Sequence, residues 1–117
     1  MATTELQAIV RFRFQNGDVE EFKRFSAQCM EIVRAQETGT LQYDTYCNDD
    51  ETECIVLERF RDSDALIEHG ENLAHLMDAI TATEEVFGEL LGEPSAQLRA
   101  RFTGGGPVQL FMPWSRM

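Results

Sequence analysis

The chain has 117 residues, of which 43% are hydrophobic, and its 21 acidic against 10 basic side chains give a formal net charge of −11. This length and apolar fraction fit one folded domain, and the acidic excess argues against a surface for nucleic-acid phosphates. No apolar run reaches the roughly 18 residues that span a bilayer, so we expect no membrane segment. The first residues lack the basic and apolar regions of a signal peptide. Three cysteines, an odd number, favour a reducing cytoplasm over a disulfide scaffold.

Residues 5–14 alternate in hydropathy and predict a first strand. The sequence Asn16-Gly17-Asp18 then breaks the strand and offers Asp18 as the N-cap of a helix. From Val19 to Val33 the apolar residues form one stripe at helical spacing, and Gly39 provides a stop signal. This part of the chain therefore predicts a strand followed by a helix.

Residues 41–47 and 54–60 alternate again around a polar stretch and predict a β-hairpin. Cys47 and Cys54 could form a cross-strand disulfide or remain two packed thiols, and in a cytoplasmic protein the thiols are favoured. Large apolar side chains occur on both faces, so we expect neither face to be fully wet. A symmetric loop places Cys47 opposite Cys54, Thr45 opposite Val56, Tyr43 opposite Glu58 and Leu41 opposite Phe60.

The second half of the chain predicts shorter elements. Asp62 or Ser63 is expected to cap a short helix that runs to His69, where Gly70 interrupts it. The remaining predicted segments are a helix over 73–80, a strand over 84–92, a short helix opened by Pro94-Ser95, a glycine hinge at 104–106 and an apolar stretch at 108–112.

The order β-α-β-β-α-β predicts an α+β fold of ferredoxin-like type with a C-terminal extension. We expect one domain over 1–117, with a core of about 5–93 and an arm of about 94–117. The helices can cover only one face of the sheet, so we infer that a second copy packs on the other face and that the arm reaches across to it. A monomer with one amphipathic, wet face is the alternative. The expected interface mixes Ile9, Tyr46, Ile55 and Leu57 with the charged Arg11, Arg13, Asp44 and Arg59, each arginine paired with an acid.

Three segments resemble the antibiotic biosynthesis monooxygenase superfamily: Gly39-x-x-x-Tyr43, Glu58-x-Phe60-x-Asp62 and Ala65-x-x-x-His69. The resemblance covers about residues 5–80, and it implies a dimeric α/β barrel of ferredoxin-like subunits. It also implies a pocket between the helices and the sheet face that they cover. In this chain the pocket would be lined by Val10, Phe12, Phe14, Tyr43, Glu58, Phe60 and His69.

The resemblance implies a monooxygenase that acts on an aromatic quinol or polyketide-like molecule and needs no cofactor and no metal. In such family members a deprotonated, electron-rich substrate passes an electron directly to O₂. His69 is the expected base because the ordinary pKa of imidazole lies near neutrality, and Glu58 and Tyr43 would orient the reactants. The expected partners are a small hydrophobic or aromatic molecule and a second copy of the chain. The alternatives are a non-catalytic binding or stress-associated module that sequesters a hydrophobic metabolite, and an isomerase or decyclase that uses no oxygen.

Several residues of this chain differ from the family pattern, and these differences bear on which activities we expect. Haem-degrading members of the superfamily carry Asn, Trp and His where this chain has Val10, His69 and Ala79, so haem degradation is not expected. His75 follows His69 by six residues instead of the family's usual five, which leaves its role open. A metal site from His69, Glu71 and His75 is not expected, because six helical residues rotate a side chain by about 240° at roughly 100° per residue.

The candidate residues also have purely structural interpretations. His69 could form a hydrogen bond with a carbonyl, Glu58 could accept a hydrogen bond from Tyr43 or an arginine, and Tyr43 could be a packing residue. Cys29 lies on the apolar stripe and is expected in the core. The acidic loop at 49–53 lacks the glycine of a calcium loop, and no Lys-Ser/Thr follows the triple glycine, as a phosphate loop requires.

Overall fold

The computed structural model describes residues 4–14, 19–102 and 106–117. Within these ranges the chain forms a sheet of five strands in the order β2-β3-β1-β4-β5 and three helices. The elements are β1 (Leu6–Arg13), α1 (Val19–Gln36), β2 (Thr40–Cys47), β3 (Glu53–Phe60), α2 (Ser63–Thr81), β4 (Glu85–Leu91), α3 (Ala96–Ala100) and β5 (Val108–Phe111).

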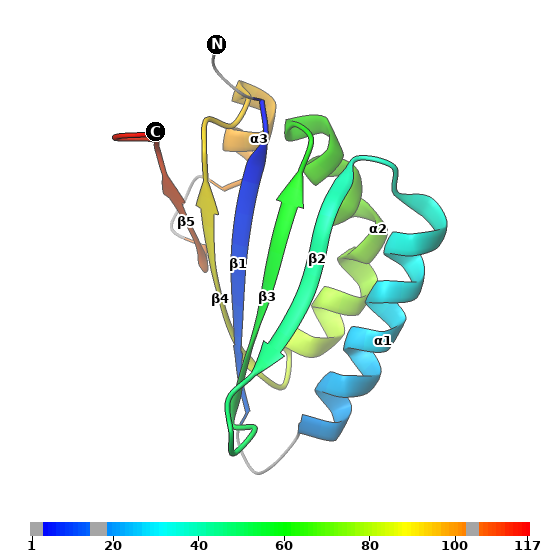
Figure 1. Ribbon diagram of the computed structural model, residues 1–117. Helices are drawn as coiled ribbons and strands as arrows, with labels where there is room; N and C mark the ends of the chain where they lie inside the picture. The colour runs from blue at the N-terminus through cyan, green and yellow to red at the C-terminus, as the bar shows by residue number, and fades with distance from the viewer. Residues whose placement is uncertain (1–3, 15–18, 103–105) are drawn as a thin grey trace.

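The two long helices lie on the same face of the sheet, and no helix of the described residues covers the opposite face (Figure 1). Strands β1 to β4 pair antiparallel, whereas β5 pairs with β4 in parallel. This confirms the predicted α+β, ferredoxin-like order β-α-β-β-α-β, to which the C-terminal extension adds α3 and β5. We call the two sides of the sheet the covered face, under α1 and α2, and the open face.

Strand β1 and helix α1 form where the hydropathy pattern predicts them. The stripe of α1 buries Phe22, Phe25, Cys29 and Val33 against the covered face. Phe12 of β1 packs among these side chains and is 2% exposed. The expected N-cap Asp18, like two of the three hinge glycines, lies outside the described residues.

Helix α2 is one continuous helix, so the predicted interruption at Gly70 is wrong. Gly70 is exposed, and a Cβ at this position would meet nothing within 4 Å. A glycine in a helix costs only about 1 kcal/mol relative to alanine, which the packing of the flanking residues outweighs. The predicted start is confirmed, since the Asp62 carboxylate accepts the Ala65 backbone N–H at 2.9 Å. Among the described residues no helix is long and apolar enough to cross a membrane.

The hairpin of β2 and β3 follows the predicted register at its closed end. Tyr43 lies opposite Glu58, as expected, but the predicted pair Leu41–Phe60 is wrong. A bulge between Thr40 and Gln42 places Thr40 opposite Phe60 and leaves Leu41 44% exposed. A bulge inserts one unpaired residue into a strand and shifts the register beyond it.

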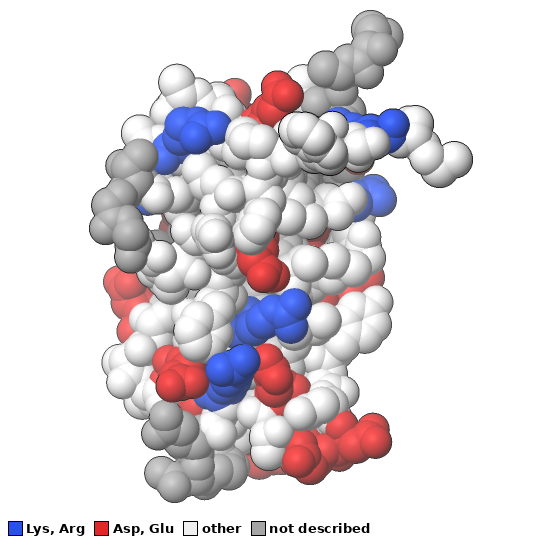
Figure 2. Space-filling view, turned by 90° about the vertical axis from the view of Figure 1, so that its left-hand side faces the viewer, with Lys and Arg blue, Asp and Glu red and all other residues white. Residues whose placement is uncertain are grey.

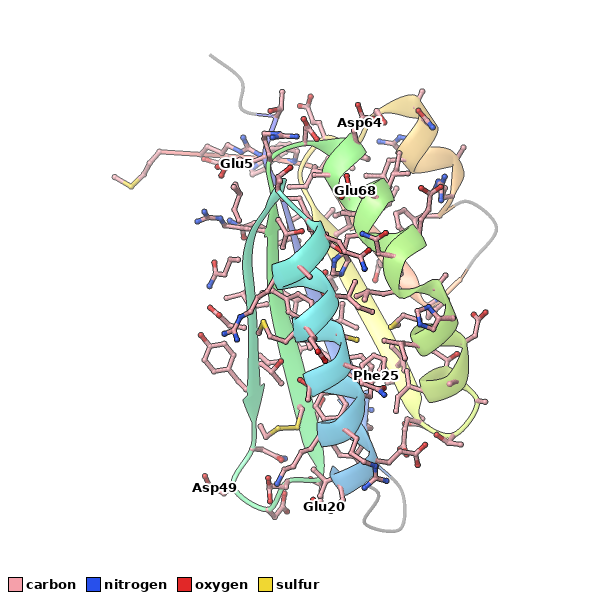
Figure 3. The ribbon with its side chains drawn as sticks, turned by 90° about the vertical axis from the view of Figure 1, so that its right-hand side faces the viewer. Glu5, Glu20, Phe25, Asp49, Asp64 and Glu68 are labelled. Atoms are coloured by element: carbon pink, nitrogen blue, oxygen red, sulfur yellow. A yellow bond between two sulfur atoms is a disulfide. The ribbon has the colours of Figure 1, made fainter. Side chains whose placement is uncertain are left out.

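Cys47 and Cys54 form a disulfide, so the favoured interpretation of two packed thiols is wrong. The two residues are directly opposite in the β2–β3 ladder with Cα atoms 4.0 Å apart, close enough for their sulfur atoms to meet. Figure 3 shows the bond near the turn that carries Asp49. Among the described residues Cys29 remains as a free, buried thiol, and the odd cysteine count therefore no longer argues against a disulfide.

The C-terminal extension packs on its own subunit. Ser95 caps α3 by accepting the Leu98 backbone N–H at 3.1 Å, and Leu98 is fully buried. β5 then lies beside β4, where Leu110 packs against a second apolar cluster around Leu6 and Leu90. After β5 the chain leaves the sheet, and Trp114 is 98% exposed.

The open face mixes apolar and charged side chains (Figure 2). Tyr46, Phe87 and Phe111 are 52%, 41% and 44% exposed there. The expected pairing of the arginines with acids occurs within the subunit. The ion pairs are Arg11–Glu89 at 3.6 Å, Arg13–Glu53 at 3.5 Å and Arg59–Glu5 at 3.9 Å.

A candidate proton-transfer site on the covered face

The covered face brings Tyr43 of β2, Glu58 of β3 and His69 of α2 together. Tyr43 and Glu58 are cross-strand partners whose side chains point toward α2. The ring of His69 lies 5.4 Å from the Tyr43 ring and 5.0 Å from the Phe60 ring, centroid to centroid. Three residues from separate parts of the sequence therefore meet in one buried cluster.

A close approach between α2 and the start of β2 sets this geometry. A Cβ on Gly39 would lie 2.5 Å from the Cβ of Ala65, so any larger residue would push the helix away from the strand. Ala65 and His69 are four residues apart and therefore lie on the same face of α2. The small pair Gly39–Ala65 thus lets the next turn of the helix place His69 over the sheet.

The structure adds Glu37, which the sequence did not single out. The Nδ1 atom of His69 lies 2.8 Å from Oε1 of Glu37, and the side chains of these residues are 9% and 2% exposed. The same carboxylate accepts hydrogen bonds from Thr40 Oγ1 at 2.6 Å and from Asn72 Nδ2 at 3.2 Å. One signal for Asn72 was present in the sequence, since it follows His69 by three residues and so shares its helix face.

Glu58 lies on the other side of the imidazole ring. Its Oε1 is 3.7 Å from Nε2 of His69. Burial raises the pKa of Glu58 to about 7, an effect that the Glu37 charge increases and the His69 charge opposes. Among these acids, Glu58 is therefore the one that can gain or lose a proton near neutrality.

The pKa values of His69 and Glu37 shift as expected for a buried ion pair. Burial disfavours the imidazolium, but the hydrogen bond to Glu37 and the Glu58 and Glu37 charges outweigh it and raise the pKa of His69. For Glu37 burial also opposes charging, and the hydrogen bonds from His69 and Thr40 outweigh it and lower the pKa. Glu37 is thus the ionised acid of the cluster.

Tyr43 and Cys29 are buried beside this cluster and belong to the same hydrophobic core. Burial raises the pKa of the Tyr43 phenol above its ordinary value and that of the Cys29 thiol to about 11. Both groups therefore keep their protons at neutral pH. Tyr43 can orient a neighbour, and Cys29 is a core residue rather than a nucleophile.

The predicted pocket residues divide into two groups. Phe60 is fully buried and contacts the His69 ring. Phe12 and Phe14 instead pack on Phe22 of α1, with ring centroids 4.9 Å and 5.1 Å apart, and Val10 borders the same apolar cluster.

The most prominent grooves among the described residues are lined by residues other than His69, Glu58 and Tyr43. One groove of about 370 Å³ between α1 and α2 is lined by residues that include Ile32, Leu76 and the exposed His75. Another of about 300 Å³ lies between the end of β4 and the C-terminal arm, beside Gly92 and Pro113. In the described parts of the chain, no group of three or more His, Cys, Asp or Glu residues is arranged to hold a metal ion.

The chemistry that this arrangement supports is proton transfer. A general base or acid works best when its pKa lies near the operating pH, which describes Glu58, whose pKa burial raises to about 7. The site resembles other buried acid–base pairs in that a third group, here Glu37, holds the histidine.

The sequence matches the family described as antibiotic biosynthesis monooxygenase over residues 6–89. No curated protein matches the chain. Among solved structures, MupZ from Pseudomonas fluorescens is 21% identical, with 98% of this chain and 94% of MupZ aligned at a TM-score of 0.77.

Two further structures share the fold of the core. PA3566 from Pseudomonas aeruginosa is 26% identical over 77% of this chain and 94% of its own, with a TM-score of 0.66. A variant of SnoaB, a cofactor-independent oxygenase from Streptomyces nogalater, is 18% identical over 75% of this chain and 91% of its own, also at 0.66. The family match ends at residue 89, and the alignment with MupZ extends over nearly the whole chain.

Proposed function

Since this chain belongs to the antibiotic biosynthesis monooxygenase family, we propose that it is a cofactor-independent monooxygenase acting on an aromatic quinol or polyketide-like small molecule. The observation that carries this proposal is the buried pair of His69 and Glu58, with Nε2 and Oε1 3.7 Å apart. The similarity of the fold to SnoaB, itself a cofactor-independent oxygenase, supports it.

The atoms and electrons of the proposed oxygenation balance without an external reductant. A base removes a proton from the phenolic substrate, and the resulting anion passes an electron to O₂. A ring carbon that loses two hydrogens gains one oxygen atom as a carbonyl, and the second oxygen atom leaves as water. The substrate therefore supplies all four electrons. In the proposed roles His69 and Glu58 accept and return the proton, and Tyr43 orients the substrate oxygen.

Oxygen uptake across a panel of hydroquinones, naphthohydroquinones and anthrones tests this function. We expect His69→Ala to lose about 10²-fold or more of the rate, the usual contribution of a general base. Glu68→Gln is the matched control, because Glu68 is the exposed neighbour of His69 on α2 (Figure 3). Equal uptake by the wild type and His69→Ala would overturn the assigned role.

A second candidate function is sequestration of a hydrophobic molecule without turnover. It is favoured by the position of the described cavities, which lie away from His69. A bound ligand at 100 times its Kd would stabilise the fold by about 2.7 kcal/mol. Thermal stabilisation by a panel member that is recovered unchanged, with no oxygen consumed, would support this function over the first.

We also propose that the working unit is a homodimer joined through the open face. The half-exposed Tyr46, Phe87 and Phe111 support this proposal, because large apolar side chains gathered on one face mark interaction surfaces. Light scattering behind a sizing column should give a dimer for the wild type and a monomer for Tyr46→Arg. Ala74→Arg, an exposed change on α2, should stay dimeric, and a monomeric wild type would contradict the proposal.

A further inference from the structure

Glu37 lies just beyond the last residue of α1, and each oxygen atom of its carboxylate has a donor. Oε1 accepts from His69 Nδ1 and from Thr40 Oγ1, and Oε2 accepts from Asn72 Nδ2. The side chain is 2% exposed. A buried carboxylate is stable as an anion only when such partners surround it, so the environment is built for a charged Glu37.

This charge state determines where the imidazole proton lies. An ionised carboxylate has no proton to donate and can only accept. At 2.8 Å from Oε1, Nδ1 of His69 must therefore carry a hydrogen. In the neutral ring the lone pair is then on Nε2, the atom 3.7 Å from Glu58.

The rings of Tyr43 and Phe60 flank the imidazole and complete its surroundings. The charged or titratable groups that face it are Glu37 from the loop after α1, Glu58 from β3 and Tyr43 from β2, and Cys29 of α1 belongs to the same buried cluster as Tyr43. Among them Glu37 alone lies within hydrogen-bond distance of a ring nitrogen in the described structure. An acid that binds the second nitrogen of a histidine fixes the tautomer and increases the basicity of the first nitrogen.

We propose that Glu37 is the positioning residue of this site, holding the Nδ1–H of His69 so that Nε2 is the atom that exchanges the proton. Its effect on catalysis rests on the function proposed above, whereas its effect on the histidine is a property of the free protein. Asn72 and Thr40 act indirectly, because their hydrogen bonds hold the Glu37 carboxylate in place.

Long-range ¹H–¹⁵N spectra of the two histidines over a pH series test this in the full chain. In the wild type, Nδ1 of His69 keeps its hydrogen throughout the titration and Nε2 is the atom that titrates. The exposed His75 provides the internal reference spectrum. In Glu37→Gln the pKa of His69 falls by about one unit or more, because the neutral amide no longer stabilises the imidazolium.

Three variants separate charge from shape. Glu37→Gln retains an acceptor and should keep the Nδ1–H tautomer, whereas Glu37→Ala removes it and should give a mixture of tautomers. Glu68→Gln removes the same charge beside His69 on the exposed side of α2 and should change neither. A neutral wild-type ring with its hydrogen on Nε2 would overturn the proposal, even if the Glu37 variants failed to fold. A shift in Glu37→Gln no larger than in Glu68→Gln would also overturn it.

Oxidation of 1,4-naphthohydroquinone adds a kinetic readout. Glu37→Gln should lower kcat more than it changes KM and move the acidic limb of the kcat profile to lower pH by the same amount as the His69 pKa. An unchanged kcat profile in a folded variant would contradict the positioning role. Lack of turnover by the wild type would overturn the proposed function, while the spectra would still decide the role of Glu37 in holding the ring.

Discussion

Acidic and basic side chains lie on both sides of the sheet, but in different settings. On the open face Arg11 and Glu89 are 3.6 Å apart with side chains 41% and 33% exposed. On the covered face His69 and Glu37 are 2.8 Å apart and 9% and 2% exposed. Water solvates the first pair, whereas the second pair depends on the protein for its remaining hydrogen bonds.

This difference determines which charged groups depend on the fold for their protonation state. The free energy of a charge that water can solvate changes little when its partner moves. A buried charge has no such solvation and therefore depends on the hydrogen-bond donors around it. The covered face therefore holds the groups whose protonation the fold controls, Glu58 and His69. The open face offers contact area and ion pairs that suit a protein partner.

The largest expected contrast between the faces is in aromatic packing. Phe60→Ala should lower the free energy of unfolding by about 3–5 kcal/mol, because the ring is fully buried against His69. Phe87→Ala should cost about 1 kcal/mol or less at low protein concentration, since this ring is 41% exposed and stacks on Arg13. Urea unfolding measures both, and equal losses would mean that the two faces shield their aromatic rings from water equally.

The effect of Phe87→Ala should also depend on protein concentration. A dimer joined through the open face buries this ring, so the loss should grow as the concentration rises. A constant loss across the concentrations at which the wild type associates would place Phe87 outside the dimer contact.

The pH dependence of stability should show the covered face directly. The folded-state pKa of Glu58 is raised to about 7 from 4.5, so between these values the unfolded chain loses a proton that the folded chain keeps. Stability should therefore fall as pH rises through this window, by at most about 1.4 kcal/mol per pH unit. The raised pKa of His69 acts in the same direction above pH 6.5. Because the pKa of Glu37 is lowered, its contribution is lost only as pH falls below 4.5.

Glu58→Gln isolates this contribution. The variant has no carboxyl group to ionise, so its urea midpoint should decline less between pH 4.5 and 7 than that of the wild type. Glu68→Gln should retain the wild-type slope, because Glu68 is exposed. A parallel decline in wild type and Glu58→Gln would show that Glu58 is not the buried acid described here.

The smallest effect is expected on the open face. A double-mutant cycle of Arg11→Ala and Glu89→Ala should give a coupling energy below about 1 kcal/mol, as for other exposed pairs. The coupling should weaken with added salt. A coupling of several kcal/mol in the monomer would mean that this face is as well shielded from water as the covered one.

Local patterns predicted much of this fold because the residues concerned act within one element. The alternation of β1, the stripe of α1 and the cap at Asp62 depend only on neighbours in sequence. The bulge that exposes Leu41 and the continuity of α2 through Gly70 were missed, since packing of the whole subunit decides both. Local propensity is a weak guide in such places.

The candidate site divides in the same way. The pairing of Tyr43 with Glu58 follows from the hairpin register, and the motif spacing indicated that His69 belongs with them. The contact of His69 with Glu37 spans 32 residues and joins a helix to a loop. Sequence periodicity does not indicate a contact between residues so far apart, so only the structure identified Glu37 as the residue that holds the histidine.

Oxygen-18 labelling is the decisive test of the proposed monooxygenase reaction and of the role of His69 in it. With ¹⁸O₂ and a substrate from the quinol and anthrone panel, the product should carry one labelled oxygen atom, and the second should appear in water. The rate of label incorporation should fall by about 10²-fold or more in His69→Ala and stay unchanged in Glu68→Gln. Product without label, or equal incorporation by the wild type and His69→Ala, would contradict the account.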